Sequence, residues 1–177
     1  FGASARPTLS GGGMTAWTEV VTTSFDALSA PTRRLTIYRA MSASPGSGPL
    51  TITFTGNQSH CQGIGAQGGG VDESGVNGAG AIVQTGSTGG DAVTGLTVTL
   101  AAVGNANTVA YGVFGVRSNL AVVTPGAGFT EISEQPSAES PGAALEAEWA
   151  LNDNTIDASW INLNGAALGI EIKVSTA

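Results

Sequence analysis

The sequence has few charged side chains, a single cysteine and no long apolar run. Charged residues make up 11% of its 177 residues, against about 25% in an average domain. The lone cysteine, Cys61, excludes an intrachain disulfide and any zinc site built from several cysteines. The apolar runs are too short for a transmembrane helix, and residues 1–13 lack the apolar stretch of a signal peptide. We therefore expect neither a membrane partner nor a disulfide framework.

Positive charge is scarce in the last third of the chain. Residues 1–117 hold five acids and five arginines, whereas residues 118–177 hold eight acids and only Lys173, which gives the whole chain a net charge of −7. Such a surface repels phosphate backbones. We therefore expect no nucleic-acid partner.

What the sequence does contain is glycine and short runs in which apolar and polar residues alternate. Its 27 glycines and 41% hydrophobic residues exclude disorder of the charged kind, and period-two alternation predicts strands. The expected strands cover residues 17–21, 35–41, 50–55, 81–84, 96–100, 109–116, 129–132, 145–151, 156–160 and 168–174. This pattern predicts an all-β fold, a single-domain antiparallel β-sandwich or jelly roll of about ten short strands over residues 14–177. Residues 1–13, which end in three glycines, are expected to be a flexible N-terminal arm.

The segment 145–151 has two chemically different faces. Leu145 and Trp149 lie on one face and Glu146 and Glu148 on the other, so we expect the first face to be buried and the glutamates to be solvated. Trp160 is likewise expected on a buried face. Paired carboxylates can hydrolyse glycosides, but only in a cleft that sets their separation. A solvated acidic face is therefore the prediction here.

No other motif predicts catalysis or a cofactor. Residues 63–68 match GxGxxG by letter, but no helix follows to receive a pyrophosphate. His60 and Cys61 are adjacent, so on a strand they point to opposite faces and cannot form a dyad. Turn oxygens could hold calcium, although Asp and Asn favour turns for backbone reasons alone. We expect no metal site, and the weak calcium candidates are Asp72, Asp153 and Asp157.

Several short motifs follow one another in a recognisable order between residues 15 and 174. They are Trp17–Val20, Arg34–Arg39, Gly70–Gly75, Ala81–Thr85, Gly126–Ile132, Leu145–Trp149 and Gly169–Lys173. This order resembles proteins from the structural-gene cassettes of tailed bacteriophages and prophage-like islands. The resemblance implies a small β-sandwich located in a virion, with no active site to transfer.

Composition and resemblance together favour a non-enzymatic structural protein. The expected function is that of a capsid decoration (cement) protein that stabilises the shell through subunit–subunit contacts. Its expected partners are copies of itself, as a trimer or larger assembly, and a major capsid protein or another virion protein. The arm could add a strand to a neighbour's sheet edge. The interface candidates are Phe1, Arg6, Pro7, Leu9, Gly68, Gly69 and Gly70.

Two other classes of function stay open. One is a secreted, extracellular carbohydrate-binding or adhesin-type module, which needs exposed aromatic side chains that stack on sugars. Its candidates are Trp17, Tyr38, Tyr111 and Phe114. The other is a subunit of an extracellular filament. An enzyme is the class that the sequence favours least.

Overall fold

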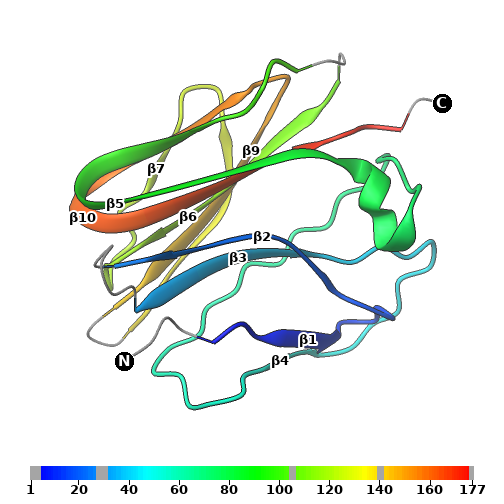
Figure 1. Cartoon of the computed structure of the whole chain (residues 1–177), viewed down its shortest axis with the longest axis horizontal. Coiled ribbons are helices and arrows are strands. Elements are labelled where there is room, and N and C mark those ends of the chain that lie inside the picture. Colours follow the sequence, from blue (N-terminus) through cyan, green and yellow to red (C-terminus); the bar gives the residue numbers. More distant parts are fainter. Residues whose placement is uncertain (1–4, 27–31, 104–106, 139–141, 176–177) are drawn as a thin grey trace.

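The computed structural model describes residues 5–26, 32–103, 107–138 and 142–175. In these ranges the chain forms ten strands and one 3-10 helix (Figure 1). The elements are β1 (Thr8–Gly11), β2 (Thr18–Phe25), β3 (Arg33–Arg39), β4 (Leu50–Thr53), η1 (Val76–Ala81), β5 (Ile82–Thr99), β6 (Val109–Val116), β7 (Thr124–Pro125), β8 (Thr130–Pro136), β9 (Ala144–Leu151) and β10 (Thr155–Ile172). The paired strands are antiparallel. The predicted all-β antiparallel fold is confirmed.

A six-stranded sheet forms the centre of the molecule. Its order is β5-β10-β6-β9-β8, and β7 also pairs with β10. The central position of β6 follows from its sequence, because Val109–Val116 is apolar on both faces and both faces are covered. Within the described ranges, the six-residue η1 is far too short to cross a membrane.

The two longest strands form a ribbon that folds back on itself. β5 and β10 are each 18 residues long, and each joins two of the short strands expected from the sequence. Figure 1 shows the β5–β10 ribbon curling back at the left edge of the view, where the pairing register shifts between Ser159 and Gly165. The two halves of the β5–β10 ribbon then pack closely against each other. A Cβ added at Gly169 would lie 2.6 Å from Cδ1 of Ile156 and 3.0 Å from Cγ1 of Val98, so glycine is needed at that position.

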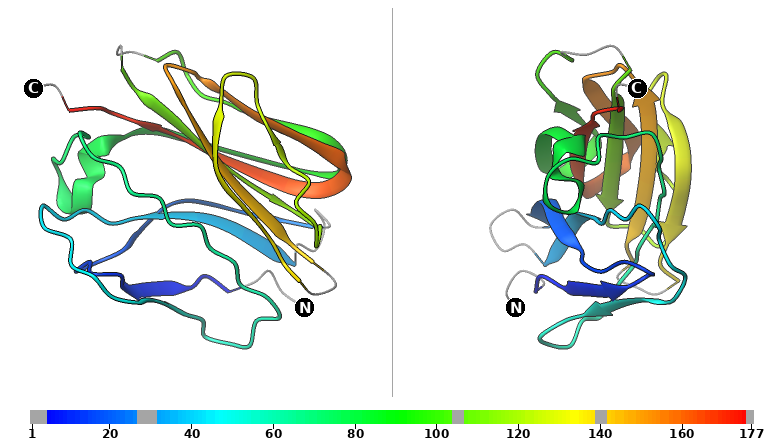
Figure 2. Two further views of the ribbon diagram at one scale, coloured as in Figure 1. Left: turned by 180° about the vertical axis from the view of Figure 1, so that it is seen from behind. Right: turned by 90° about the vertical axis from the view of Figure 1, so that its right-hand side faces the viewer.

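The main sheet is covered on both faces. The folded-back half of the ribbon consists of residues 95–99 of β5 and the residues of β10 that pair with them, 155–159. It covers one face of the main sheet, with a core that contains Val98, Phe114, Ile156 and Trp160. The two-stranded β2–β3 sheet covers the other face, where Phe25, Leu35 and Ile37 pack against Val113 and Leu168. A second two-stranded sheet, β1–β4, lies outside β2–β3 (Figure 2).

Part of the segment expected to be an arm is a strand of its own chain. Thr8–Gly11 forms β1 and pairs with β4, and the hydroxyl of Tyr38 donates a hydrogen bond of 2.7 Å to the carbonyl of Pro7. Gly11 and the two glycines after it have positive φ, which lets the chain turn from β1 toward β2.

Asp26, at the end of β2, ties the β2–β3 sheet to the main sheet. Its carboxylate accepts hydrogen bonds from Asn164 of β10 (3.0 Å) and Thr32 (2.9 Å) and pairs with the guanidinium of Arg33. Arg117 lies 3.6 Å away. Burial raises the pKa of Asp26, but the hydrogen bonds from Asn164 and Thr32 and the charges of the two arginines outweigh it and hold the pKa below its usual value.

Replacing Asp26 with asparagine should destabilise the fold at neutral pH. Asparagine tolerates the positive φ of this residue but removes the charge that pairs with Arg33, so we expect a loss of about 2–3 kcal/mol at pH 7. Because the folded pKa is depressed, the stabilisation is present above the unfolded value near 4 and disappears as pH falls below it. Urea denaturation at pH 7 and pH 3 measures this. An equal loss at both values would contradict the charge-based explanation.

Candidate functional site

The largest stretch without charge lies between Arg39 and Asp72. Residues 40–71, here called the uncharged segment, contain no Asp, Glu, Lys or Arg. They include β4 and a long connection to η1, and Figure 2 shows this connection running along the main sheet. Much of the segment is exposed to solvent. Interface cores are depleted of charged residues, so this surface has the composition of a contact region.

Residues 60–69 lie outside any sheet. In the part of the chain that the structure describes, their N–H and C=O groups make no backbone hydrogen bond. Side-chain exposure alternates as in a strand: His60, Gln62 and Ile64 are half-buried, whereas Cys61 and Gly63 are exposed. Residues 60–65 therefore contact the chain with alternate side chains and pair with no strand of the described residues.

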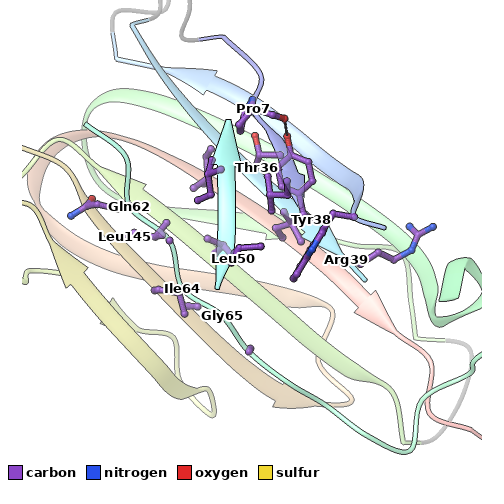
Figure 3. Close-up of a pocket in the computed structure, with 18 of the residues that line it drawn as sticks. Pro7, Thr36, Tyr38, Arg39, Leu50, Gln62, Ile64, Gly65 and Leu145 are labelled. Atoms are coloured by element: carbon purple, nitrogen blue, oxygen red, sulfur yellow. Dashed lines mark hydrogen bonds between the residues drawn. The ribbon is translucent and has the colours of Figure 1, made fainter. Parts of the chain in front are cut away.

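A cavity of about 1820 Å³ separates the uncharged segment from the main sheet. Leu50 of β4, Ile64 and Leu145 of β9 lie around it, together with Tyr38 of β3 (Figure 3). The space is open to solvent, and apolar side chains around it, such as those of Leu50 and Trp149, are partly exposed.

Trp149 lies on the same face of the main sheet, and its position corrects the sequence-based prediction. Its side chain is 38% exposed, whereas Trp160 is buried as expected, at 7%. Tyr111 of β6 stands directly opposite Trp149 in the register and is half-buried. Both residues line the cavity. Of the predicted sugar-stacking candidates, Phe114 is fully buried in the opposite core, while Trp17 and Tyr38 are half-buried and line the cavity.

The expectation that Glu146 and Glu148 form a solvated face is wrong. Both are 0% exposed, because the folded-back half of the ribbon covers their face of β9. Ile156 of that half marks the contact, since a Cβ added at Gly112 would meet both Ile156 (2.6 Å) and Glu148 (3.2 Å). Leu151, on the same face of β9 as Leu145 and Trp149, is exposed.

The two buried carboxyl groups differ in their hydrogen bonds. Within the described residues, both oxygens of Glu146 and Oε1 of Glu148 have no partner, while Oε2 of Glu148 accepts from the amide of Gly126 at 3.2 Å. Burial, with the nearby charges of Glu148, Glu131 and Glu134, raises the pKa of Glu146 to about 9. Burial also raises the pKa of Glu148 to about 7, against the Gly126 hydrogen bond that lowers it. Glu146 is therefore a neutral acid at physiological pH.

The weak calcium candidates are not brought together as ligands. Asp72 lies 2.7 Å from Nζ of Lys173, Asp153 accepts a hydrogen bond from the amide of Thr155, and Asp157 is half-buried in β10. Across the described ranges, no three His, Cys, Asp or Glu side chains converge in a way that could hold a metal ion.

The predicted interface residues fall into two groups. Arg6, Pro7 and Leu9 lie in or next to β1; Arg6 pairs with Glu19 at 3.2 Å, and Leu9 stands opposite Ile52 of β4. The three glycines 68–70 are exposed, and a Cβ on any of them would meet open space. Phe1 lies outside the described residues. Of the predicted interface residues, the glycines 68–70 belong to the uncharged segment. Leu9 lies outside it but stands opposite Ile52, which belongs to it.

Comparison with known proteins yields no assignment: no family model, no curated protein and no solved structure matches the chain.

Proposed function

We propose that the protein is a non-enzymatic structural component of a virion, a capsid decoration protein that binds copies of itself and the major capsid protein. The observation that carries the proposal is the exposed uncharged segment, residues 40–71. A chain with net charge −7 repels its own copies over most orientations. Contact through this segment avoids that repulsion and shields the open apolar cavity from water.

A charge placed on this surface should weaken self-association. Leu50 is 45% exposed in β4, and Val83 of β5, outside the uncharged segment, is 47% exposed. We expect Leu50→Glu to weaken association at least tenfold, which corresponds to about 1.4 kcal/mol. The matched control Val83→Glu should change it by less than about threefold. Sedimentation velocity over a range of concentrations measures both. Equal effects of the two variants would count against the uncharged segment as the interface.

The Trp149–Tyr111 pair favours a second candidate function, carbohydrate binding by a secreted module. Two aromatic side chains on one sheet face can stack on sugar rings, and amide side chains such as Gln62 line the same cavity. A glycan array separates the two proposals. Binding that Trp149→Ala abolishes supports the carbohydrate-binding module, whereas no glycan binding leaves the structural role as the better proposal.

A further inference from the structure

The cavity beside the main sheet differs in charge from the rest of the molecule. Four of the five arginines of the chain line it, namely Arg33, Arg34, Arg39 and Arg117, and Asp26 is the one acidic residue among its described lining residues. The lining therefore has a formal charge of +3, whereas the whole chain has a net charge of −7. A positive cleft in a negative protein concentrates anions from solution. The charge of the lining thus favours an anionic ligand.

The lining arginines extend along the cavity and do not gather at one point. Arg33 and Arg39 are the first and last residues of β3, so their Cα atoms lie about 20 Å apart at about 3.4 Å per residue. Arg117 lies at the Arg33 end, because both contact Asp26. Arg39 lies beside η1 (Figure 3), where its Nε donates a hydrogen bond of 3.1 Å to the carbonyl of Asn77. This spacing fits an extended polymer that carries several negative charges better than a single small anion.

Asp26 does not neutralise all of this positive charge. Its carboxylate pairs with Arg33, and Arg117, which lies 3.6 Å from the same carboxylate, has a side chain that is 52% exposed. Within the described ranges Arg39 forms no ion pair. A guanidinium presents planar pairs of N–H donors that match the oxygens of an oxyanion. Arg39 and Arg117 therefore provide an anion contact near each end of β3.

The uncharged groups around the cavity favour a carbohydrate as the anionic polymer. Trp149 is 38% exposed, and Tyr111 stands opposite it in the register; aromatic side chains of this kind can stack on sugar rings. The side-chain amides of Gln58 and Gln62 also line the cavity and can donate to and accept from sugar hydroxyls. The net charge of −7 disfavours a nucleic acid, which carries one negative charge per about 1.7 Å of duplex.

We propose that the cavity binds an acidic polysaccharide, with Arg39 and Arg117 contacting its carboxylate or sulfate groups and Trp149 stacking on a sugar ring. The inference rests on the second candidate function above, carbohydrate binding, and adds the class of carbohydrate. The bound sugar chain extends along β3, from the Arg117 end of the cavity to the end beside η1.

Two matched pairs of probes separate charge from sugar recognition. Oligogalacturonate and its methyl ester differ in their carboxylates, and dextran sulfate and dextran differ in their sulfates. In calorimetric titrations of the full chain at low salt, we expect at least one acidic probe to bind about tenfold or more tightly than its neutral counterpart. The difference should shrink at about 0.5 M salt, because salt screens the charges.

Three results of these titrations would overturn the inference. Equal affinity within both pairs would overturn it and leave carbohydrate binding itself intact. Binding of single-stranded DNA as tight as that of the acidic probe would replace the polysaccharide with a general polyanion. Binding of none of the four sugar probes would overturn both the inference and the second candidate function.

Arg39→Gln tests the arginine contact, and Arg6→Gln is the matched control. Arg6 has a side chain that is 62% exposed and is the one arginine outside the described lining. Arg39→Gln should weaken binding of the acidic probe about tenfold, whereas Arg6→Gln should stay within about twofold of the unmodified chain. Far-ultraviolet circular dichroism checks that both variants remain folded. Equal effects of the two substitutions would overturn the assignment of the cavity as the binding site.

Discussion

Replacing Glu146 with methionine should stabilise the protein at neutral pH. The carboxyl group is 0% exposed and has no hydrogen-bond partner among the described residues, so it contributes desolvation cost without a compensating interaction. Methionine has a similar shape and needs no partner. One pKa unit corresponds to about 1.36 kcal/mol, and we expect a gain of roughly 2–3 kcal/mol at pH 7 by urea denaturation.

The gain should depend on pH in a defined direction. Because the pKa of Glu146 is raised to about 9 in the fold, the contribution of this residue to stability is most favourable below its unfolded value near 4.5 and becomes less favourable as pH rises toward 9. The methionine variant lacks this loss, so the difference between the two proteins should grow from pH 5 to pH 9. A difference that stays constant with pH would contradict the assignment of Glu146 as a buried neutral acid.

Glu134, opposite Glu146 in the register, provides the matched control. Its Oε1 accepts hydrogen bonds from the amides of Val122 (2.7 Å) and Val123 (2.9 Å). Glu134→Met leaves these two amides without their acceptor and should therefore destabilise the protein by about 1–3 kcal/mol. If Glu146→Met raises the free energy of unfolding and Glu134→Met lowers it, each effect follows from whether the carboxylate has hydrogen-bond partners. If both substitutions stabilise the protein, the cause is the added hydrophobic side chain and not the missing hydrogen-bond partner of Glu146.

The two tryptophans that the sequence placed on buried faces should respond very differently to truncation. Trp160 is 7% exposed and meets Phe114 edge to face, with ring centroids 6.2 Å apart. Trp160→Ala should cost about 3–5 kcal/mol, because it opens a cavity between the folded-back half of the ribbon and the main sheet. Trp149→Ala, at the partly exposed position, should cost less than about 1.5 kcal/mol. Chemical denaturation of both variants measures the contrast.

Similar losses for the two variants would contradict the arrangement of layers described here. Large losses for both variants would match the prediction made from the sequence, which placed both tryptophans on buried faces. The contrast thus tests which face of β9 the ribbon covers.

Alternation along the sequence identified the strands well but not the faces of β9. Val109–Val116 matches β6, and residues 145–151 match β9 within one residue. The face assignment failed because hydrophobicity favours burying Leu145 and Trp149 over Glu146 and Glu148. The folded-back half of the ribbon, which includes Ile156 shortly after β9 in the chain, covers the glutamate face as well. Alternation within residues 145–151 does not show that the chain folds back over this face.

The sequence analysis expected two short strands where β5 and β10 are each a single long strand: residues 81–84 and 96–100 in β5, and residues 156–160 and 168–174 in β10. Gly169 and Gly86 mark places where the ribbon packs on itself: added Cβ atoms would lie 2.6 Å from Ile156 and 2.6 Å from Val98, respectively. Glycine in a strand can signal such a close approach as well as a turn.

The uncharged segment can be identified in the sequence, but no interface was predicted from its lack of charge. Arg39 and Asp72 bound a stretch without any Asp, Glu, Lys or Arg, and a scan for charge-free windows would have found it. Its position beside the main sheet could not have been found in this way, because the contact of Ile64 with the core depends on the tertiary fold. The candidate site thus combines a compositional signal in the sequence with a position over the main sheet that only the structure reveals.

The most direct test of the proposed structural role is the mass of the unmodified full chain in solution. Size-exclusion chromatography with light scattering, over a hundredfold range of concentration, should give a defined multiple of 17.5 kDa. Because the contact is uncharged, the mass should change little between low and high salt. A mass of 17.5 kDa at every concentration would contradict self-assembly and, with it, the role proposed for residues 40–71.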